Sequence, residues 1–188
     1  KLRIFRNAEV SVETLLASAC LPTIHRSIVI DGEPYWDGGY SANPAVFPLV
    51  YECSAADILL ILLTPLRYAQ APDSAANIRQ RLLELSFNST FLREMRMFAH
   101  LRDAVGTRRW QKWLPGSPVE RRIESLRFHA ISADALLGEL PADSKLTVNL
   151  PFFEQLRDSG RDHARHWLFE NCGAIGRRQS LDLANLFY

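Results

Sequence analysis

Six consecutive apolar residues, at positions 58–63, restrict the chain to a narrow set of folds. The run does not alternate with polar residues, so a β-strand made from it would be apolar on both of its faces. Strands of this kind lie inside parallel sheets that helices cover on both sides, with neighbouring strands along both edges. A second strand-like segment follows at residues 126–131, after a long helical stretch. This alternation of strands and helices predicts a layered α/β protein.

Helix and turn signals place the remaining elements around these two strands. Ser11 is a good N-cap, Pro44 suits a first helical position, and Gly106 can close a long helix. The apolar stripe of that long helix predicts a face buried in the core, and it consists of Ile78, Leu82, Leu85, Leu92, Met95 and Leu101. We expect helices at residues 11–19, 44–51, 74–106, 151–171 and 173–188, and the end of a third core strand at residues 1–5. Three core strands are few for a closed layered domain.

A hairpin at residues 27–37 delivers an acidic side chain to a turn. Its first arm ends in Asp31-Gly32, a dipeptide that favours two-residue turns because both of its positions need a positive φ. The returning arm leads to Asp37, directly before Gly38 and Gly39, which let the backbone turn sharply and approach another loop closely. We therefore expect Asp37 at a strand end on one rim of the main sheet, with its carboxylate facing a cleft or an open edge, in a position to serve a functional site. The alternative is an aspartate that only caps the next turn. We interpret Asp31 as a turn residue.

The residues on both sides of this hairpin resemble those of the patatin-like phospholipase family. Residues 17–22 read ASACLP and are similar to the family's short helix that ends in ASA-x-x-P. Residues 30–39 fit its I-D-G-x-x-Y-x-D-G-G hairpin, and residues 41–44 fit its S-x-N-P sequence. The resemblance extends over residues 1–188 and implies the C-terminal part of a single patatin-like domain. The implied fold is a three-layer α/β fold related to the α/β-hydrolases, incomplete here because its N-terminal part is missing.

In this family the aspartate of the D-G-G box pairs with a serine in a catalytic dyad, which implies that Asp37 is a general base. A serine hydroxyl becomes a good nucleophile when a positioned carboxylate removes its proton. The family's serine lies in a G-x-S-x-G motif after a Gly-rich loop, and neither pattern occurs in this chain. The nearest string, residues 39–43, lacks the final glycine. We therefore expect the base without the nucleophile, and the N-terminal part of the same domain is required for activity.

The resemblance implies a lipid acyl hydrolase, a phospholipase or esterase that cleaves acyl lipids or phospholipids without a cofactor or metal. This chain alone is expected to be inactive. The alternative is a non-catalytic scaffold of the same fold that binds lipid or protein. A net charge of +1 argues against binding to nucleic acid. Cys20, Cys53 and Cys172 are widely separated and odd in number, which suits free thiols in a reducing compartment. We expect a cytoplasmic location or one peripheral to a membrane.

Two further groups of residues allow a functional and a structural interpretation. Arg108, Arg109, Trp110 and Trp113 combine basic and interfacial aromatic side chains, which could contact the surface of an anionic membrane. Their alternative is a structural loop with buried tryptophans and solvated arginines. His163 and His166 share one helix face, but no third ligand at a suitable spacing accompanies them, so we interpret them as surface histidines rather than metal ligands.

Overall fold

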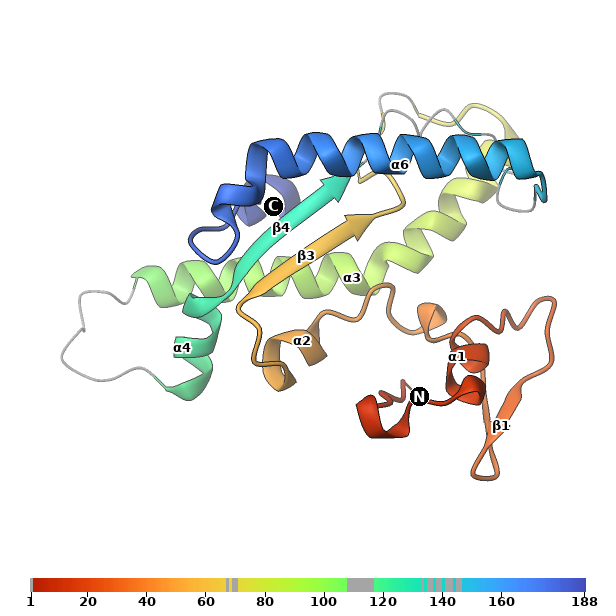
Figure 1. The fold of residues 1–188 in the computed structure, drawn as a ribbon, viewed down its shortest axis with the longest axis horizontal. Helices are drawn as coiled ribbons and strands as arrows, with labels where there is room; N and C mark the ends of the chain where they lie inside the picture. The colour runs from red at the N-terminus through yellow and green to blue at the C-terminus, as the bar shows by residue number, and fades with distance from the viewer. Residues whose placement is uncertain are drawn as a thin grey trace.

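The computed structural model describes residues 2–66, 68, 71–107, 117–132, 134, 137, 140, 144 and 147–188. Arg108, Arg109, Trp110 and Trp113, the predicted membrane contacts, lie outside the described residues. Figure 1 shows two parts side by side: an N-terminal module of residues 2–44 and a body that begins at Val46. The body contains a parallel sheet between long helices, so the predicted mixed α/β class is confirmed.

The secondary structure begins with short elements and ends with long helices. In chain order the elements are the 3-10 helix η1 (Asn7–Glu9), α1 (Val12–Ser18), β1 (Ile28–Ile30), β2 (Glu33–Tyr35), the 3-10 helix η2 (Gly38–Tyr40), α2 (Phe47–Glu52), β3 (Asp57–Leu62), α3 (Ala75–Thr107), α4 (Pro118–Ser125), β4 (Arg127–Ser132), α6 (Leu150–Asn171), the 3-10 helix η5 (Cys172–Ala174) and α7 (Leu183–Phe187). Both predicted body strands are present within one residue of their expected bounds. Residues 2–6 form no strand, so the strand expected at residues 1–5 is wrong.

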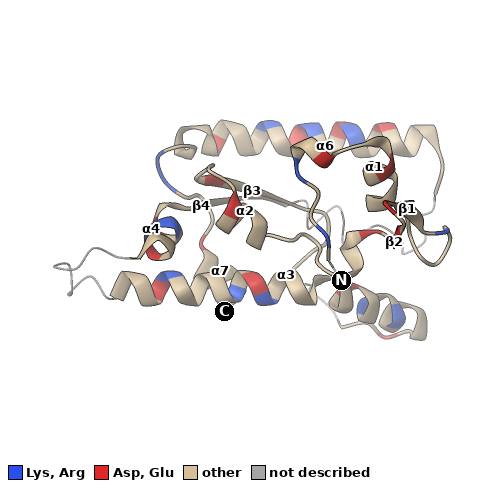
Figure 2. Cartoon of the chain, turned by 90° about the horizontal axis from the view of Figure 1, so that it is seen from below, with Lys and Arg blue, Asp and Glu red and all other residues tan. Residues whose placement is uncertain are grey.

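Strands β3 and β4 pair in parallel, in a register that runs from Asp57 opposite Arg127 to Leu62 opposite Ser132. Figure 2 shows α6, this sheet and α3 as three successive layers. Alternate residues of β3 point toward α3 and are buried. The resulting core cluster consists of Val46, Val50, Ile58, Leu60, Leu62, Phe91, Met95, Phe98, Ala99, Leu126, Phe128, Leu183 and Phe187. Burial of this apolar set is the main stabilising contribution to the body.

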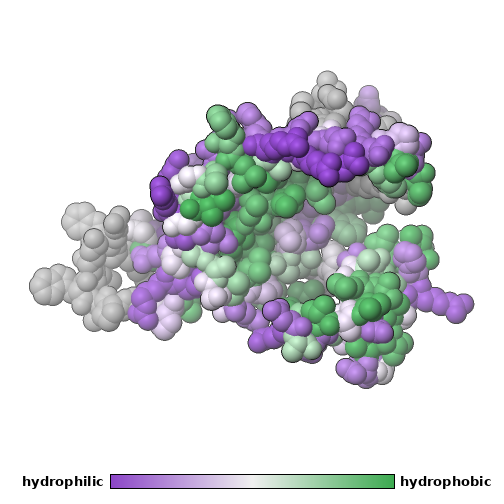
Figure 3. All heavy atoms as spheres, viewed as in Figure 1, coloured by the Kyte–Doolittle hydropathy of each residue, from purple (hydrophilic) through white to green (hydrophobic). Residues whose placement is uncertain are grey.

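The opposite face of β3 is uncovered within the part of the chain that the structure describes. Leu59 is 45% exposed and Ile61 65% exposed, although both are large apolar side chains. They lie opposite His129 and Ile131 of β4, on the face that α6 covers, but α6 packs over β4 and leaves β3 open. Figure 3 shows the hydrophobic surface that results below α6. We expected both faces of β3 to be buried, but among the described residues only the face toward α3 is buried.

The predicted stripe of the long helix is buried only in its second half. Met95 is fully buried, together with Phe91 and Phe98, whereas Ile78, Leu82 and Leu85 are 45–59% exposed. Figure 1 shows the reason: the N-terminal half of α3 extends beyond the ends of β3 and β4, so no sheet lies against it. The prediction that the whole stripe faces the core is thus wrong for its first three positions.

Three helices differ from the expected ones, and a contact between distant residues explains the first difference. Helix α2 starts at Phe47 rather than Pro44, because the Glu94 carboxylate of α3 accepts hydrogen bonds from the backbone N–H groups of Val46 and Phe47. Helix α4 was not predicted, although Ser117 starts it with a capping box that includes Glu120. The expected last helix forms only over α7.

The two halves of α3 should respond differently to truncation of an apolar side chain. Met95→Ala leaves a cavity at a fully buried position and should lower the free energy of unfolding by about 2–5 kcal/mol. Leu82→Ala, on the same helix but 59% exposed, should change it by less than about 0.5 kcal/mol. Urea unfolding monitored by circular dichroism measures both values. Equal losses in the two variants would contradict the described position of α3.

Candidate functional site

The hairpin of the N-terminal module has the predicted turn. Asp31 and Gly32 have φ values of 51° and 82°, as the two central positions of a two-residue turn require. Strands β1 and β2 pair antiparallel with Ile28 opposite Tyr35, which sets the direction in which the chain leaves the hairpin. The interpretation of Asp31 as a turn residue is confirmed, and the next polar residue after the second arm is Asp37.

Hydrogen bonds of both the backbone and the side chain hold Asp37 in place. Its backbone N–H donates to the carbonyl oxygen of Cys20, at the end of α1, over 2.9 Å. Its carboxylate Oδ1 accepts the backbone N–H of Gly39 over 2.8 Å and thereby caps η2. The other carboxylate oxygen, Oδ2, accepts no hydrogen bond from any described residue. Asp37 is thus oriented through one oxygen, and the second can accept a further donor.

The two glycines after Asp37 differ in how much space they require. A Cβ on Gly39 would lie 3.1 Å from Asp37 Oδ1 and 3.8 Å from the Phe87 ring of α3, so a side chain there would crowd the carboxylate. A Cβ on Gly38 would lie 3.6 Å from Leu2, which is an ordinary contact. Neither glycine has a positive φ. The close approach expected for both glycines is therefore a property of Gly39.

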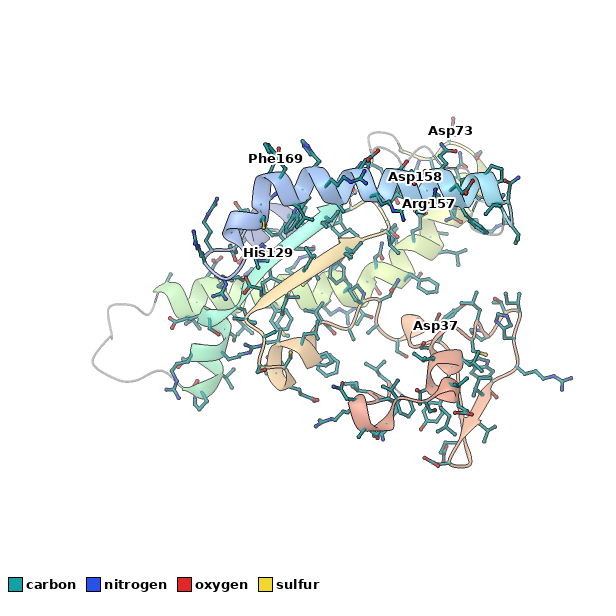
Figure 4. All side chains as sticks on the ribbon, in the orientation of Figure 1. Asp37, Asp73, His129, Arg157, Asp158 and Phe169 are labelled. Atoms are coloured by element: carbon teal, nitrogen blue, oxygen red, sulfur yellow. The ribbon has the colours of Figure 1, made fainter. Side chains whose placement is uncertain are left out.

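Asp37 lines a cleft of about 840 Å³, most of which is formed by the N-terminal module, with Glu52 of the body at its edge. The cleft walls come from residues 2–6, from α1, from the second arm of the hairpin and from the loop at residues 37–41. This position differs from the expected one, at the rim of the main sheet, because the hairpin forms a two-stranded sheet of its own. Figure 4 shows Asp37 on the N-terminal module, away from His129 on β4.

Most polar groups of the cleft already form ion pairs or hydrogen bonds within the protein. Arg6 forms an ion pair with Glu52 of α2 over 2.7 Å, across the opening between module and body. The hydroxyls of Thr14 and Ser18 donate to backbone carbonyls of their own helix turn. Ser41 donates its backbone N–H to Gly38. No serine hydroxyl among the described residues forms a hydrogen bond with Asp37, so the cleft presents a carboxylate without a neighbouring nucleophile.

A second polar cluster lies on the face of the sheet beneath α6, and it contains the residue types of a Ser-His-Asp triad. The imidazole of His129 lies between Ser180 Oγ, 2.8 Å from Nδ1, and Asp57 Oδ1, 3.0 Å from Nε2. Asp57 also receives two hydrogen bonds from the Arg127 guanidinium and one from the Gly176 backbone N–H. The five residues come from β3, from β4 and from the segment after η5, and no local sequence pattern connects these segments.

The surroundings of this cluster favour a structural role over catalysis. His129 is 1% exposed and packs edge-on against Trp167 of α6. The backbone N–H of Ser180 donates to the carbonyl of Phe128, so it is not free to stabilise the substrate oxyanion that would form if the Ser180 hydroxyl attacked a carbonyl carbon. The carboxylate of Asp57 accepts hydrogen bonds from Arg127 and Gly176 as well as from His129. We therefore interpret the cluster as a clamp that fastens the C-terminal segment to the sheet.

The clamp makes stability depend on the ionisation of Asp57. Hydrogen bonds from Arg127, then from the Gly176 N–H and His129, hold the pKa of Asp57 well below its usual range. A depressed folded-state pKa contributes stability above the unfolded-state value of about 4, and that contribution disappears as the pH falls through the folded-state pKa. The clamp therefore stabilises the fold at neutral pH and weakens in strong acid.

Asp57→Asn should lower the melting temperature at neutral pH, because the amide cannot accept the bidentate guanidinium as the carboxylate does. The difference from the parent should shrink as the pH falls below about 4, because Asp57 then becomes protonated in the unfolded state and the stabilisation of the parent declines until the pH has passed the depressed folded-state pKa. Circular dichroism melts over this range measure it. Asp158→Asn is the control, because Asp158 pairs with Arg157 on the exposed side of α6 (Figure 4) and should matter little. A pH-independent loss in Asp57→Asn would argue against the ionised clamp.

The remaining candidate residues have ordinary surroundings. His163 Nδ1 lies 2.8 Å from the carbonyl oxygen of Ser159, and His166 lies 3.4 Å from Glu170. Within the described ranges no three His, Cys, Asp or Glu side chains are grouped so that they could hold a metal ion. The three cysteines are unpaired. No helix in the described part of the chain combines the length and the hydrophobicity needed to cross a membrane.

Comparison with known proteins adds no relative: no family model matches the chain, and neither the curated proteins nor the solved structures contain a match. The resemblance to patatin-like phospholipases therefore depends on the residues of the hairpin and its flanks. The structure adds to it a fixed carboxylate in a cleft.

Proposed function

We propose that this chain is part of a lipid acyl hydrolase in which Asp37 is the general base of a Ser–Asp dyad. The observation that carries the proposal is the state of its carboxylate: Gly39 holds one oxygen, and the other has no partner among the described residues. A general base needs both features, a fixed orientation and an oxygen within hydrogen-bond reach of the proton it removes. The cleft of about 840 Å³ leaves room for the reacting ester.

The proposed reaction proceeds through an acyl-enzyme. Asp37 takes the proton of a serine hydroxyl, the serine oxygen attacks the ester carbonyl carbon, and the proton passes to the departing alcohol. A water molecule then gives its proton to Asp37 and attacks the acyl-serine, which releases the carboxylic acid and restores the hydroxyl. The serine comes from sequence upstream of the hairpin, since no described serine contacts Asp37. The reaction needs no cofactor.

The open face of β3 supports a larger domain of the three-layer type. Leu59 and Ile61 are exposed apolar side chains on a strand that pairs along one edge only among the described residues. A further strand beside β3 and a helix over these side chains would complete the layer order that α3, the sheet and α6 begin. We propose that the upstream part of the same domain supplies both. Without the upstream serine, the same fold would be a scaffold that binds lipid or protein.

The dyad predicts a specific loss in Asp37→Asn. In a polypeptide that includes the upstream serine, this variant should hydrolyse a chromogenic acyl ester about 10²–10⁴ times more slowly, because the amide cannot take the proton. Asp31→Asn is the matched control: Asp31 lies in the same hairpin, and asparagine tolerates its positive φ. The chain of residues 1–188 alone should show no turnover. Parental activity in Asp37→Asn, or turnover by residues 1–188, would refute the dyad.

Gly39→Ala tests the positioning of the same carboxylate. The added Cβ would lie 3.1 Å from Asp37 Oδ1, so the carboxylate must shift slightly. Activity should fall, by less than the roughly 10²-fold that a misplacement of about 1 Å can cost. Gly38→Ala introduces the same methyl group in an ordinary contact and should retain activity. Steady-state hydrolysis by both variants gives the comparison. Equal activities would mean that the contact between Gly39 and Asp37 does not orient the base.

A further inference from the structure

A second cavity, of about 430 Å³, lies where the chain leaves β3 and meets the N-terminal half of α3. Its walls come from the side of α3 between Arg81 and Leu92 and, after β3, from Pro65, Leu66, Tyr68, Ala71 and Pro72. The volume falls in the range of small-molecule sites. Its place also fits a binding site, since ligands of open parallel sheets bind outside the carboxyl ends of the strands.

One side of this cavity is apolar from the core outward. Leu66 and Leu92 line it and also pack against the core cluster of the body. Leu85, about two helical turns before Leu92, lines the cavity but is 55% exposed. An apolar wall that extends from the core to the solvent is suited to an extended hydrocarbon chain, because each methylene group that leaves water makes the free energy of binding more favourable.

The other side of the cavity is polar and charged. The Arg81 guanidinium lies over the ring of Tyr68 and 3.6 Å from Glu84. Tyr68 donates its hydroxyl to Glu84 over 2.8 Å, and its burial, followed by this hydrogen bond, raises its pKa to about 12. Asn88 also lines the cavity, and its amide forms no hydrogen bond with any described residue. Arg81 and Asn88 can therefore donate hydrogen bonds to an anionic oxygen.

We propose that this cavity binds a single-chain acyl lipid, with its carboxylate or phosphate oxygens at Arg81 and Asn88 and its hydrocarbon chain along Leu85, Leu92 and Leu66. A fatty acid and a lysophospholipid share this chemistry. The inference rests on the proposed function for the ligand class, and it names a site separate from the Asp37 cleft. Helix α3 connects the two: Phe87, next to Asn88, contacts Tyr40 of the Asp37 loop, with ring centroids 4.8 Å apart.

Isothermal titration with the full-length protein carrying Asp37→Asn tests binding without turnover. The two probes are dodecanoic acid and lysophosphatidylcholine with the same dodecanoyl chain, both below their critical micelle concentrations. At least one probe should bind, and Leu85→Arg should weaken it about tenfold or more by placing a charge in the apolar wall. Leu83→Arg is the matched control: Leu83 is also 55% exposed on α3 but does not line the cavity.

The head group is tested by Arg81→Gln, with Arg79→Gln as the control from the exposed side of the same helix. Arg81→Gln should weaken the probe that binds, while Arg79→Gln should not. Tighter binding of dodecanoic acid identifies a free fatty acid as the ligand, and tighter binding of the lysolipid identifies the phosphate head group.

Equal melting temperatures of parent and variants show that the changes leave the fold intact. Leu85→Ala provides a milder second variant, which should also weaken binding.

Two outcomes would overturn the cavity proposal. One is the absence of binding by both probes, and the other is an equal effect of Leu83→Arg and Leu85→Arg, which would indicate adsorption to the surface of α3. The result is separable from that for the dyad. A protein that binds the probes but has no Asp37-dependent hydrolysis would refute the dyad alone, and a hydrolase that binds neither probe would refute the cavity alone.

Discussion

The carboxylate of Asp57 joins three segments of the body that are far apart in the sequence. Its partners on β4 are 70 and 72 residues away, and Gly176 is 119 residues away. Parallel strands cannot be joined by a tight turn, so the pairing of β3 with β4 requires closure of a long loop. A bidentate bond to Arg127, with a hydrogen bond to His129, offsets part of that cost at the first residue pair of the ladder. The positions of α6 and α7 follow, because Gly176 and Ser180 lie in the segment that connects them.

Features that depend on neighbouring residues could be predicted from the sequence. The turn at Asp31-Gly32 follows from two residues that accept a positive φ, and α1 follows from Ser11 as its N-cap. The apolar run at residues 58–63 indicated a parallel strand, because its composition reports burial whatever its neighbours are. For the turn and for α1, the interactions that decide the local structure lie within a few residues of one another. For the strand, the partner β4 is distant, but the burial that selects the strand can be read from its own composition.

Features that depend on distant contacts could not be predicted. The start of α2 is set by Glu94, which is 47 residues from Phe47 in the sequence. The exposure of Leu82 and Leu85 depends on where the sheet ends beneath α3, and a helical stripe does not contain that information. The candidate site shows the same division. Asp37 could be singled out from the sequence of its hairpin. The crowding that distinguishes Gly39 from Gly38, and the cavity beside Arg81, depend on the three-dimensional arrangement and could not be predicted from the sequence.

The open side of β3 has a consequence for handling the protein. A strand with an unpaired edge and exposed leucine and isoleucine side chains can pair with the same strand of another molecule. A net charge of +1 provides little electrostatic repulsion between copies. Residues 1–188 prepared alone are thus expected to self-associate as their concentration rises. Any segment of the same polypeptide that covers β3 would prevent this self-association, because it would occupy the unpaired edge of β3 before a second molecule could pair with it.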